Sequence, residues 1–328
     1  MLPFVGHTKP VRCVAFSPDG RVLVSGADDG RLLIWDRLSA DVKHSISVGY
    51  QSVKAVACHP DNKRFAAGWR YYPLNVLGTP DRLRFWMLET GKPAHVDHPE
   101  GSQFWQRVTG GEVQEIEIIN SEGILAIHFL PDGERVLIHT HEAAQYPPIL
   151  YTRTFLRVQL FQILPTEPQK TWLDRRAGVR AVSLAQDGES VAVATGEFVR
   201  VGRLDASRVS PGYHTSGEVR SLTLSPDGTM LAGCWGNRVT VWDTSGGTEV
   251  REFEGHTAKV EAVAYSPDGA TIASASLDGS VMLWQPDTGS VRVRYDWGLG
   301  PVHALAFAPD GLTLAVAGDG GLVLFDLE

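Results

Sequence analysis

Residues 255–285 read GHTAKVEAVAYSPDGATIASASLDGSVMLWQ, and this stretch decides the fold. Near its centre is a turn, SPDG, in which proline presets the first dihedral angle, aspartate caps the turn through its side chain and glycine accepts a positive φ. Around the turns lie four runs with the alternation and β-branched content of strands. They are VEAVAYS (260–266), ATIASAS (270–276), SVMLWQ (280–285) and SVRVRYD (290–296). No window of the chain has a convincing helical period, so the stretch predicts a unit of four β-strands.

The same turn recurs along the chain. SPDG or a close variant occupies residues 17–20, 59–62, 130–133, 185–188, 225–228, 266–269 and 308–311. The aspartates of these turns are 42, 71, 55, 40, 41 and 42 residues apart. Because a propeller blade repeats every ~40–45 residues, four of these separations fit a blade and two predict insertions in the second and third repeats. We therefore expect an all-β fold, a single seven-bladed β-propeller of four-stranded antiparallel blades over residues 1–328.

The last repeat ends early. Only 18 residues follow Asp310, which is enough for two strands but not for three. The N-terminal segment 2–7 (LPFVGH) resembles the fourth strand of the fifth repeat, 251–256 (REFEGH). We therefore expect residues 1–7 to supply the outer strand of the last blade and to close the ring, which would leave only short, protected strand edges.

Composition limits the partners and the compartment. Thirty lysines and arginines against 38 aspartates and glutamates give a net charge of −8, and an acidic chain is a poor general binder of nucleic acid. No stretch approaches 18 apolar residues, and the N-terminus lacks the features of a signal peptide, so we expect no membrane span and no export. The cysteines Cys13, Cys58 and Cys234 are odd in number and far apart, which argues against a disulfide framework and a thiolate zinc site. A monomeric, cytoplasmic propeller is the expectation.

Paired residues at the ends of the repeats carry a family resemblance. The first repeat begins with Gly6-His7 and ends its third strand with Trp35-Asp36, and the sixth begins with Gly255-His256 and ends at Trp284. The fifth keeps Trp242-Asp243. The chain thus resembles the WD-repeat family, strongly in repeats 1, 5, 6 and 7 and weakly in repeats 2 to 4, with degenerate repeats of a bacterial type. In the weak repeats the Gly-His pair is missing, and Phe161 and Leu204 are expected where repeats 3 and 4 would carry tryptophan. A TolB-like propeller shares the SPDG turns but would not explain the paired residues.

Two sets of residues have the composition of a hydrolase triad followed by a tryptophan. They are His7, Ser25, Asp29 and Trp35, and His256, Ser274, Asp278 and Trp284. The family resemblance implies that each set is a hydrogen-bonded chain inside a blade, which would make the blade rigid. A nucleophile would also need an exposed site and oxyanion donors, which nothing in the sequence implies. We therefore expect a structural role and no enzyme activity.

Histidines offer the remaining candidate chemistry. His139 and His141 lie two apart in an expected strand and share a face, so a zinc or nickel site is conceivable, but two ligands are too few. His95, Asp97 and His98 form a weaker cluster of the same kind. Ordinary packing is the favoured interpretation, and no metal or cofactor is expected.

Insertions add aromatic residues to one face. In this architecture the links between blades and the turns between second and third strands share a face, called the top face. Insertions at 71–81 and 143–154 lengthen such turns, and the segment 99–121 lies on the same face if residues 89–97 form the fourth strand of the second blade. The alternative alignment makes residues 112–118 that strand and moves the insertion to the opposite face. Aromatic rings suit an interface core, although they could equally pack the loops against each other.

The start of each first strand should also reach the top face. These positions are Arg12, Lys54, Leu125, Arg180, Arg220, Glu261 and His303, of which four are basic. The resemblance implies partner contacts here, whereas the alternative is a rim of solvated charges offset by Asp28, Glu197, Glu218 and Glu261. The partner-binding set expected from both arguments is Arg12, Lys54, Arg180, Arg220, Tyr71, Tyr72, Tyr146 and Trp235.

Together these features predict a non-catalytic scaffold. We expect it to bind a partner protein or an acidic peptide on the top face, because converging basic side chains on an acidic chain favour an anionic ligand. Two alternatives stay open at this point. One is a propeller enzyme, or a binder of a metal or small ligand, that uses the central channel. The other is a propeller module of a larger signalling protein.

Overall fold

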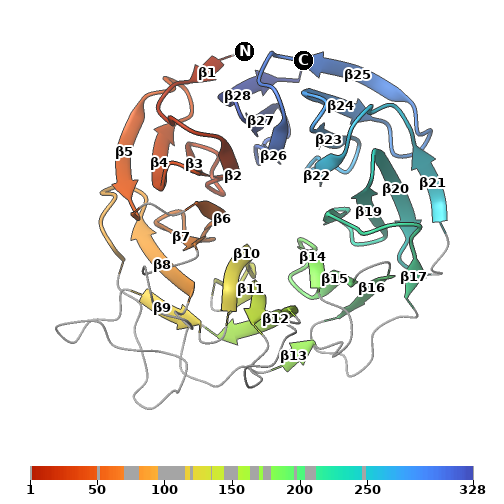
Figure 1. Cartoon of the computed structure of the whole chain (residues 1–328), viewed down its shortest axis with the longest axis horizontal. Coiled ribbons are helices and arrows are strands. Elements are labelled where there is room, and N and C mark those ends of the chain that lie inside the picture. Colours follow the sequence, from red (N-terminus) through yellow and green to blue (C-terminus); the bar gives the residue numbers. More distant parts are fainter. Residues whose placement is uncertain are drawn as a thin grey trace, which may run out of the picture. The chain divides into compact units, whose positions relative to one another are not determined.

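A computed structural model of the chain describes residues 2–49, 52–69, 81–94, 115–118, 121–133, 135–143, 154–162, 170–172, 179–195, 198–203, 212–245 and 249–327. In these ranges 28 strands form seven sheets, each of four antiparallel strands (Figure 1). Two compact units divide the chain, Met1–Val14 with Val179–Glu328, and Ala15–Gly178. The sheet topology is that of the expected β-propeller, and each sheet is one blade.

The first unit contains four blades, whose strands succeed one another in chain order. Blade 4 is β14 (Val179–Leu184), β15 (Ser190–Thr195), β16 (Phe198–Arg203) and β17 (Tyr213–His214). Blade 5 is β18 (Ser221–Leu224), β19 (Met230–Trp235), β20 (Arg238–Asp243) and β21 (Glu249–Phe253). Blade 6 is β22 (Val260–Tyr265), β23 (Ile272–Ser276), β24 (Ser280–Trp284) and β25 (Val291–Asp296). Blade 7 is β26 (Val302–Phe307), β27 (Thr313–Gly318), β28 (Gly321–Asp326) and the N-terminal β1 (Leu2–Phe4).

The other three blades belong to the second unit, except that residues 11–14 of the first strand of blade 1 belong to the first unit. Blade 1 is β2 (Val11–Phe16), β3 (Val22–Ala27), β4 (Arg31–Asp36) and β5 (Val42–Ser47). Blade 2 is β6 (Val53–Cys58), β7 (Arg64–Trp69), β8 (Asp81–Met87) and β9 (Glu115–Ile118). Blade 3 is β10 (Ser121–Phe129), β11 (Arg135–Ala143), β12 (Thr154–Gln162) and β13 (Lys170–Trp172).

The N-terminal strand completes the last blade, as the short seventh repeat predicts. Leu2, Pro3 and Phe4 pair antiparallel with Leu324, Val323 and Leu322 of β28 (Figure 1). Phe4 is buried, whereas Val5 just beyond the strand is 85% exposed. One apolar ring therefore anchors the strand in the blade.

The recurring turn has the backbone that its residues require. The glycines at its fourth position have φ between 68° and 73°, and Asn62, the one replacement, has φ 58°. Asparagine is one of the few residues that tolerate this conformation. In blade 6 the Gly269 amide bonds the Ser266 carbonyl at 2.9 Å, and Asp268 Oδ1 accepts the Ala270 amide at 3.0 Å. The turn is thus fixed locally, which explains why it survives in every repeat.

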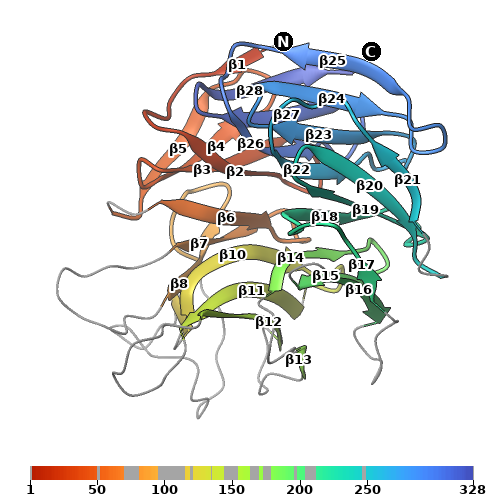
Figure 2. The same ribbon diagram turned by 45° about the vertical axis from the view of Figure 1, so that its right-hand side comes forward.

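Burial distinguishes the strands of a blade. In blade 6 every residue of β23 and β24 is buried, whereas β25, which pairs with β24 at the edge of the sheet (Figure 2), is almost wholly exposed. The second and third strands are therefore continuous runs of small and apolar residues, and the fourth is amphipathic. Large rings fill the blades at one register position, where Trp284 lies opposite Ile272 and Trp242 opposite Leu231.

That register position also tests the expected tryptophan replacements. Phe161 does occupy it in blade 3, opposite Val136. In blade 4 the residue opposite Val191 is Gly202, so the assignment to Leu204 is wrong by two residues. A glycine leaves no side chain from which the register could be recognised in the sequence.

The outer strand of blade 2 agrees with the alternative alignment considered above, since β9 (Glu115–Ile118) lies within residues 112–118. Residues 92–94 also contact β8, since the Ala94 amide bonds the Phe85 carbonyl at 2.9 Å and Pro93 bridges to Trp86. However, β9 (Glu115–Ile118) pairs with Asp81–Arg84 at the other end of β8. The favoured alignment, in which 89–97 supplies a turn and the fourth strand, is therefore wrong, because the fourth strand of this sheet is β9. The insertions 71–81 and 143–154 lie almost entirely outside the described residues.

Candidate functional site

The triad-like residues of blade 6 form a buried hydrogen-bonded chain. Trp284 Nε1 donates to Ser274 Oγ at 2.8 Å, and that hydroxyl lies 2.8 Å from His256 Nε2. His256 Nδ1 lies 3.0 Å from Asp278 Oδ2. Because the indole can only donate and the carboxylate can only accept, the bonds run from tryptophan through serine and histidine to aspartate.

The surroundings of this chain suit a structural role. Ser274 has no exposed surface, so no substrate can reach its hydroxyl. Burial lowers the pKa of His256, which keeps the imidazole neutral. Burial would raise the pKa of Asp278, but hydrogen bonds from Ser280, the Thr257 amide and His256 outweigh it and hold that pKa well below its usual range.

Blade 1 repeats part of this arrangement. Trp35 Nε1 donates to Ser25 Oγ at 2.8 Å, and both residues are fully buried. Asp29 Oδ1 accepts the Arg31 amide at 3.0 Å in the turn between β3 and β4. The participation of His7, which lies in the other unit, stays a prediction.

Five of the seven first-strand positions share a backbone feature that the sequence analysis did not identify. Their register shifts by one residue against the second strand, which is the signature of a β-bulge. The bulged residues are Lys54, Leu125, Arg180, Glu261 and His303. A bulge re-aims a side chain at the end of a strand. These positions are therefore equivalent by geometry and not only by count.

A short sequence signal accompanies the bulges. Each of the seven positions follows valine or isoleucine and precedes a small residue: VRC (11–13), VKA (53–55), ILA (124–126), VRA (179–181), VRS (219–221), VEA (260–262) and VHA (302–304). In blades 5, 6 and 7 the preceding Val219, Val260 and Val302 are fully buried. The variable residue sits between two packed neighbours, and this pattern could have located the bulges from the sequence.

Acidic side chains face most of the basic ones. Arg180 pairs with Glu218, and Arg220 Nη1 lies 3.2 Å from Glu261 Oε1. These pairs join blade 4 to blade 5 and blade 5 to blade 6 within the first unit. In the second unit Lys54 Nζ lies 3.3 Å from Asp28 Oδ1. The expected offset of the basic charges by acids therefore exists for Asp28, Glu218 and Glu261, while Glu197 lies outside the described residues.

Arg12 of blade 1 contacts blade 7 through His303. Arg12 Nη1 lies 2.8 Å from His303 Nε2, and the same nitrogen lies 2.7 Å from Asp319 Oδ1. The first unit thus carries five ionisable residues at the starts of its first strands, and those of blades 4, 6 and 7 are bulged. We call these residues Arg12, Arg180, Arg220, Glu261 and His303 the bulge row.

The predicted aromatic contacts are less well placed. Trp235 is only 7% exposed, and its ring stacks on Trp242 with centroids 5.7 Å apart, so it packs inside blade 5. Tyr71, Tyr72 and Tyr146 lie outside the described residues. Among the described residues of the expected set, those that meet are therefore charged and not aromatic.

The structure places the predicted histidine clusters only in part. His139 and His141 lie in β11 opposite Val158 and Leu156, and His95, Asp97 and His98 are outside the described residues. No group of three or more potential metal ligands occurs among the residues that the structure describes. Among the same residues, no helix could cross a membrane.

Comparison with known proteins identifies the repeats. Residues 2–36, 209–243, 247–285 and 296–326 match the family described as WD domain, G-beta repeat. These segments correspond to repeats 1, 5, 6 and 7, in which the sequence resemblance is strong.

Individual relatives match more distantly. A ribosome biogenesis protein BOP1 homolog from Anopheles gambiae is 25% identical over 301 residues, covering 86% of this chain and 33% of that protein. The human ribosome biogenesis protein BOP1 is 24% identical over 299 residues, covering 86% and 38%. An intraflagellar transport protein 122 homolog from Xenopus tropicalis is 47% identical over 65 residues, covering 20% and 6%. The chain spans little more than a third of the first two proteins, and these eukaryotic relatives do not support the expected bacterial type.

Proposed function

We propose that the chain is a WD-repeat protein, four of whose repeats match that family, and that it is a non-catalytic scaffold that binds a partner protein through the bulge row. The observation that supports the proposal most is the repeated bulge, which places one side chain at the same end of the first strand in blades 4, 6 and 7. Residues far apart in the sequence also meet there, since Arg12 contacts His303 and Arg220 contacts Glu261.

An acidic protein segment is the partner that we propose for this surface. The side chains of Arg180 and Arg220 are 49% and 40% exposed. Ion pairs at such exposed positions contribute only about 0–1 kcal/mol to stability. A carboxylate on a partner can therefore replace Glu218 or Glu261 at little cost. The exchange would keep both guanidinium groups paired while adding contacts with the partner.

The relatives support only the scaffold role. Their printed names refer to ribosome biogenesis and intraflagellar transport, but the alignments cover a minor part of each protein. We therefore propose no particular pathway. Cytoplasmic localisation belongs to the same proposal and is supported by the cysteine usage, with Cys13 and Cys234 buried.

The test is a double charge reversal, Arg180→Glu with Arg220→Glu. Proteins retained by the immobilised chain from an extract of its source cells are measured by quantitative mass spectrometry. For at least one protein that the parent retains, the retained amount should fall about tenfold, equivalent to about 1.4 kcal/mol of binding free energy. The melting temperature should stay nearly unchanged.

A matched control reverses the same number of charges elsewhere in the first unit. Arg203→Glu with Arg292→Glu changes two exposed arginines at the opposite ends of their blades, where Arg203 pairs with Glu189 and Arg292 bonds Thr271. This variant should retain the partners as the parent does. Equal retention by all three proteins would refute the bulge row as the binding surface.

A further inference from the structure

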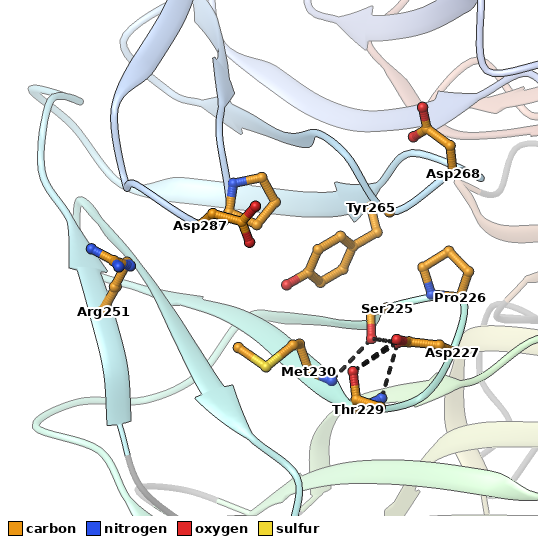
Figure 3. A pocket seen from close by; sticks show the side chains of 11 residues that line it. Ser225, Pro226, Asp227, Thr229, Met230, Arg251, Tyr265, Asp268 and Asp287 are labelled. Carbon is orange, nitrogen blue, oxygen red and sulfur yellow. Dashed lines mark hydrogen bonds between the residues drawn. The ribbon is translucent and has the colours of Figure 1, made fainter.

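A cavity of about 480 Å³ lies at the other end of the first strands, between blades 5 and 6 (Figure 3). Two SPDG turns, 225–228 and 266–269, border it, together with the turn that carries Pro286 and Asp287. Tyr265 ends β22, whereas Glu261 of the bulge row begins it, so the cavity and the bulge row are separated by the length of that strand. The proposed function does not use this cavity.

Tyr265 places an unpartnered polar group in the cavity. Its side chain is 9% exposed, and its hydroxyl is buried without a hydrogen-bond partner among the described residues. Figure 3 shows the hydroxyl directed into the space bounded by Asp287, Met230 and Thr229. A buried hydroxyl without a partner is unfavourable, and a ligand that bonds it would remove the penalty.

The fold does not require this hydroxyl. At the same position before the turn, the other six repeats carry Phe16, Cys58, Phe129, Leu184, Leu224 and Phe307. Packing at this point therefore needs only an apolar side chain. The oxygen of Tyr265 is an addition peculiar to blade 6, which is what a binding role would produce.

The charges around the cavity select the ligand. Three carboxylates, of Asp227, Asp268 and Asp287, line it against a single guanidinium, that of Arg251. Asp227 is held by its own turn, where its carboxylate accepts bonds from Ser225 Oγ at 2.6 Å and from the Thr229 amide at 3.1 Å. Burial together with Asp227 and Asp287 raises the pKa of Tyr265, so its hydroxyl stays protonated. An anion would meet net repulsion, whereas a cation would be attracted.

The walls of the cavity define the shape of that cation. Met230 and Pro226 supply apolar surface beside the carboxylates (Figure 3), and Pro286 also lines the cavity. Arginine and lysine bury an aliphatic stem along such surface while the charged head finds polar partners. Asp287 has no hydrogen bond or ion pair within the described residues, so its carboxylate is available to the head group.

We propose that this cavity binds a basic side chain of a partner protein, with arginine the better fit. The planar guanidinium carries five donors, which suits simultaneous bonds to the Tyr265 oxygen and to a carboxylate of Asp287. The opposed Arg251, whose Nη1 donates to the Thr288 carbonyl at 3.3 Å, lies on β21 and is free to pair with an acidic neighbour of that side chain. The ligand is thus a protein segment, and the cavity is a second recognition site.

Methionine methyl groups provide a direct readout. The chain has four methionines, of which Met230 lines the cavity while Met87 and Met282 lie elsewhere. The full chain, labelled with ¹³C at the methionine methyls, is titrated by NMR with N-acetyl-arginine amide, N-acetyl-lysine amide and N-acetyl-glutamate amide. Saturable movement of the Met230 signal by the arginine compound, with the Met87 and Met282 signals fixed, supports the proposal. Movement by the lysine compound as well supports the wider class of basic side chains.

Variants separate binding from folding. Tyr265→Phe and Asp287→Asn should each lower the affinity for the arginine compound by about threefold or more, and the two together by about tenfold. Since the hydroxyl has no partner, Tyr265→Phe should melt at or above the temperature of the parent. The control Glu254→Gln removes an equally negative charge outside the cavity, where it pairs with Arg238, and should leave the titration unchanged.

Several outcomes would overturn the proposal. They are an unmoved Met230 signal, equal movement by the glutamate compound, and unchanged binding to both cavity variants. Arg180→Glu with Arg220→Glu should not weaken binding of the arginine compound, so failure of this site and failure of the bulge row are distinguishable.

Discussion

Single side chains show where local sequence determines structure and where it does not. His256, Ser274, Asp278 and Trp284 could be grouped from the sequence because their spacing repeats that of His7, Ser25, Asp29 and Trp35. The grouping did not distinguish a catalytic triad from a structural chain on geometry alone. Burial does, because Ser274 is inaccessible and the Asp278 carboxylate already accepts hydrogen bonds from His256, the Thr257 amide, and the amide and hydroxyl of Ser280.

Asp278→Ala is the residue-scale prediction. Removing the carboxylate leaves His256 and the Thr257 amide without an acceptor, so the free energy of unfolding should fall by about 1–3 kcal/mol in urea denaturation at pH 7. The loss should shrink on acidification. The folded-state pKa of Asp278 is depressed, so its stabilisation is present above the unfolded pKa and is lost as pH falls through the folded pKa.

Blade 7 supplies the control for that experiment. Asp319 occupies the same place in its blade, six residues before Phe325, but its side chain is 43% exposed against 5% for Asp278. Asp319→Ala should change the free energy of unfolding by less than about 1 kcal/mol. If both variants lose the same stability, the buried chain has no special role in holding blade 6 together.

At the scale of elements, prediction from sequence succeeds where the signal is local. The SPDG turn fixes two strands within ten residues, and its repetition gave the number of blades and the role of the N-terminal strand. The favoured prediction for the outer strand of blade 2 was wrong because both 89–97 and 112–118 have the pattern of a strand. The pairing of β8 with β9 spans an insertion, so sequence distance could not decide between them. The cavity between blades 5 and 6 could not be foreseen, since turns separated by some forty to sixty residues meet only in the folded sheets.

Deletion of residues 1–7 is the element-scale prediction. The blade would lose the pairing of β1 with β28 and the buried ring of Phe4, and should be less stable by several kcal/mol, on the order of a third of a typical domain's stability. Thermal unfolding followed by circular dichroism measures the change. Val5→Ala, which shortens an exposed side chain in the same segment, should leave the melting temperature unaltered. A truncated chain that melts within a few degrees of the parent would show that β1 is dispensable.

At the scale of the whole molecule, the net charge of −8 acts differently on the two proposed ligands. A basic side chain is attracted both by the chain as a whole and by the carboxylates of the cavity. An acidic segment is repelled by the chain as a whole and attracted only near Arg180 and Arg220. Salt screens charges beyond about 8 Å at physiological ionic strength, so it weakens the long-range effect in both cases.

The two sites should therefore differ in their response to salt. Raising sodium chloride from ~0.05 to ~0.5 M should lower the affinity of the cavity for N-acetyl-arginine amide by about threefold or more. Salt screens both the attraction by the whole chain and the attraction by the carboxylates of the cavity. The protein retained through Arg180 and Arg220 should respond less, because screening removes repulsion as well as attraction. Titration of the Met230 signal and retention of the partner, each at both salt concentrations, measure the contrast. Arginine binding that ignores salt would mean that the apolar walls of Met230, Pro226 and Pro286 hold the ligand and that the carboxylates of the cavity contribute nothing to its recognition.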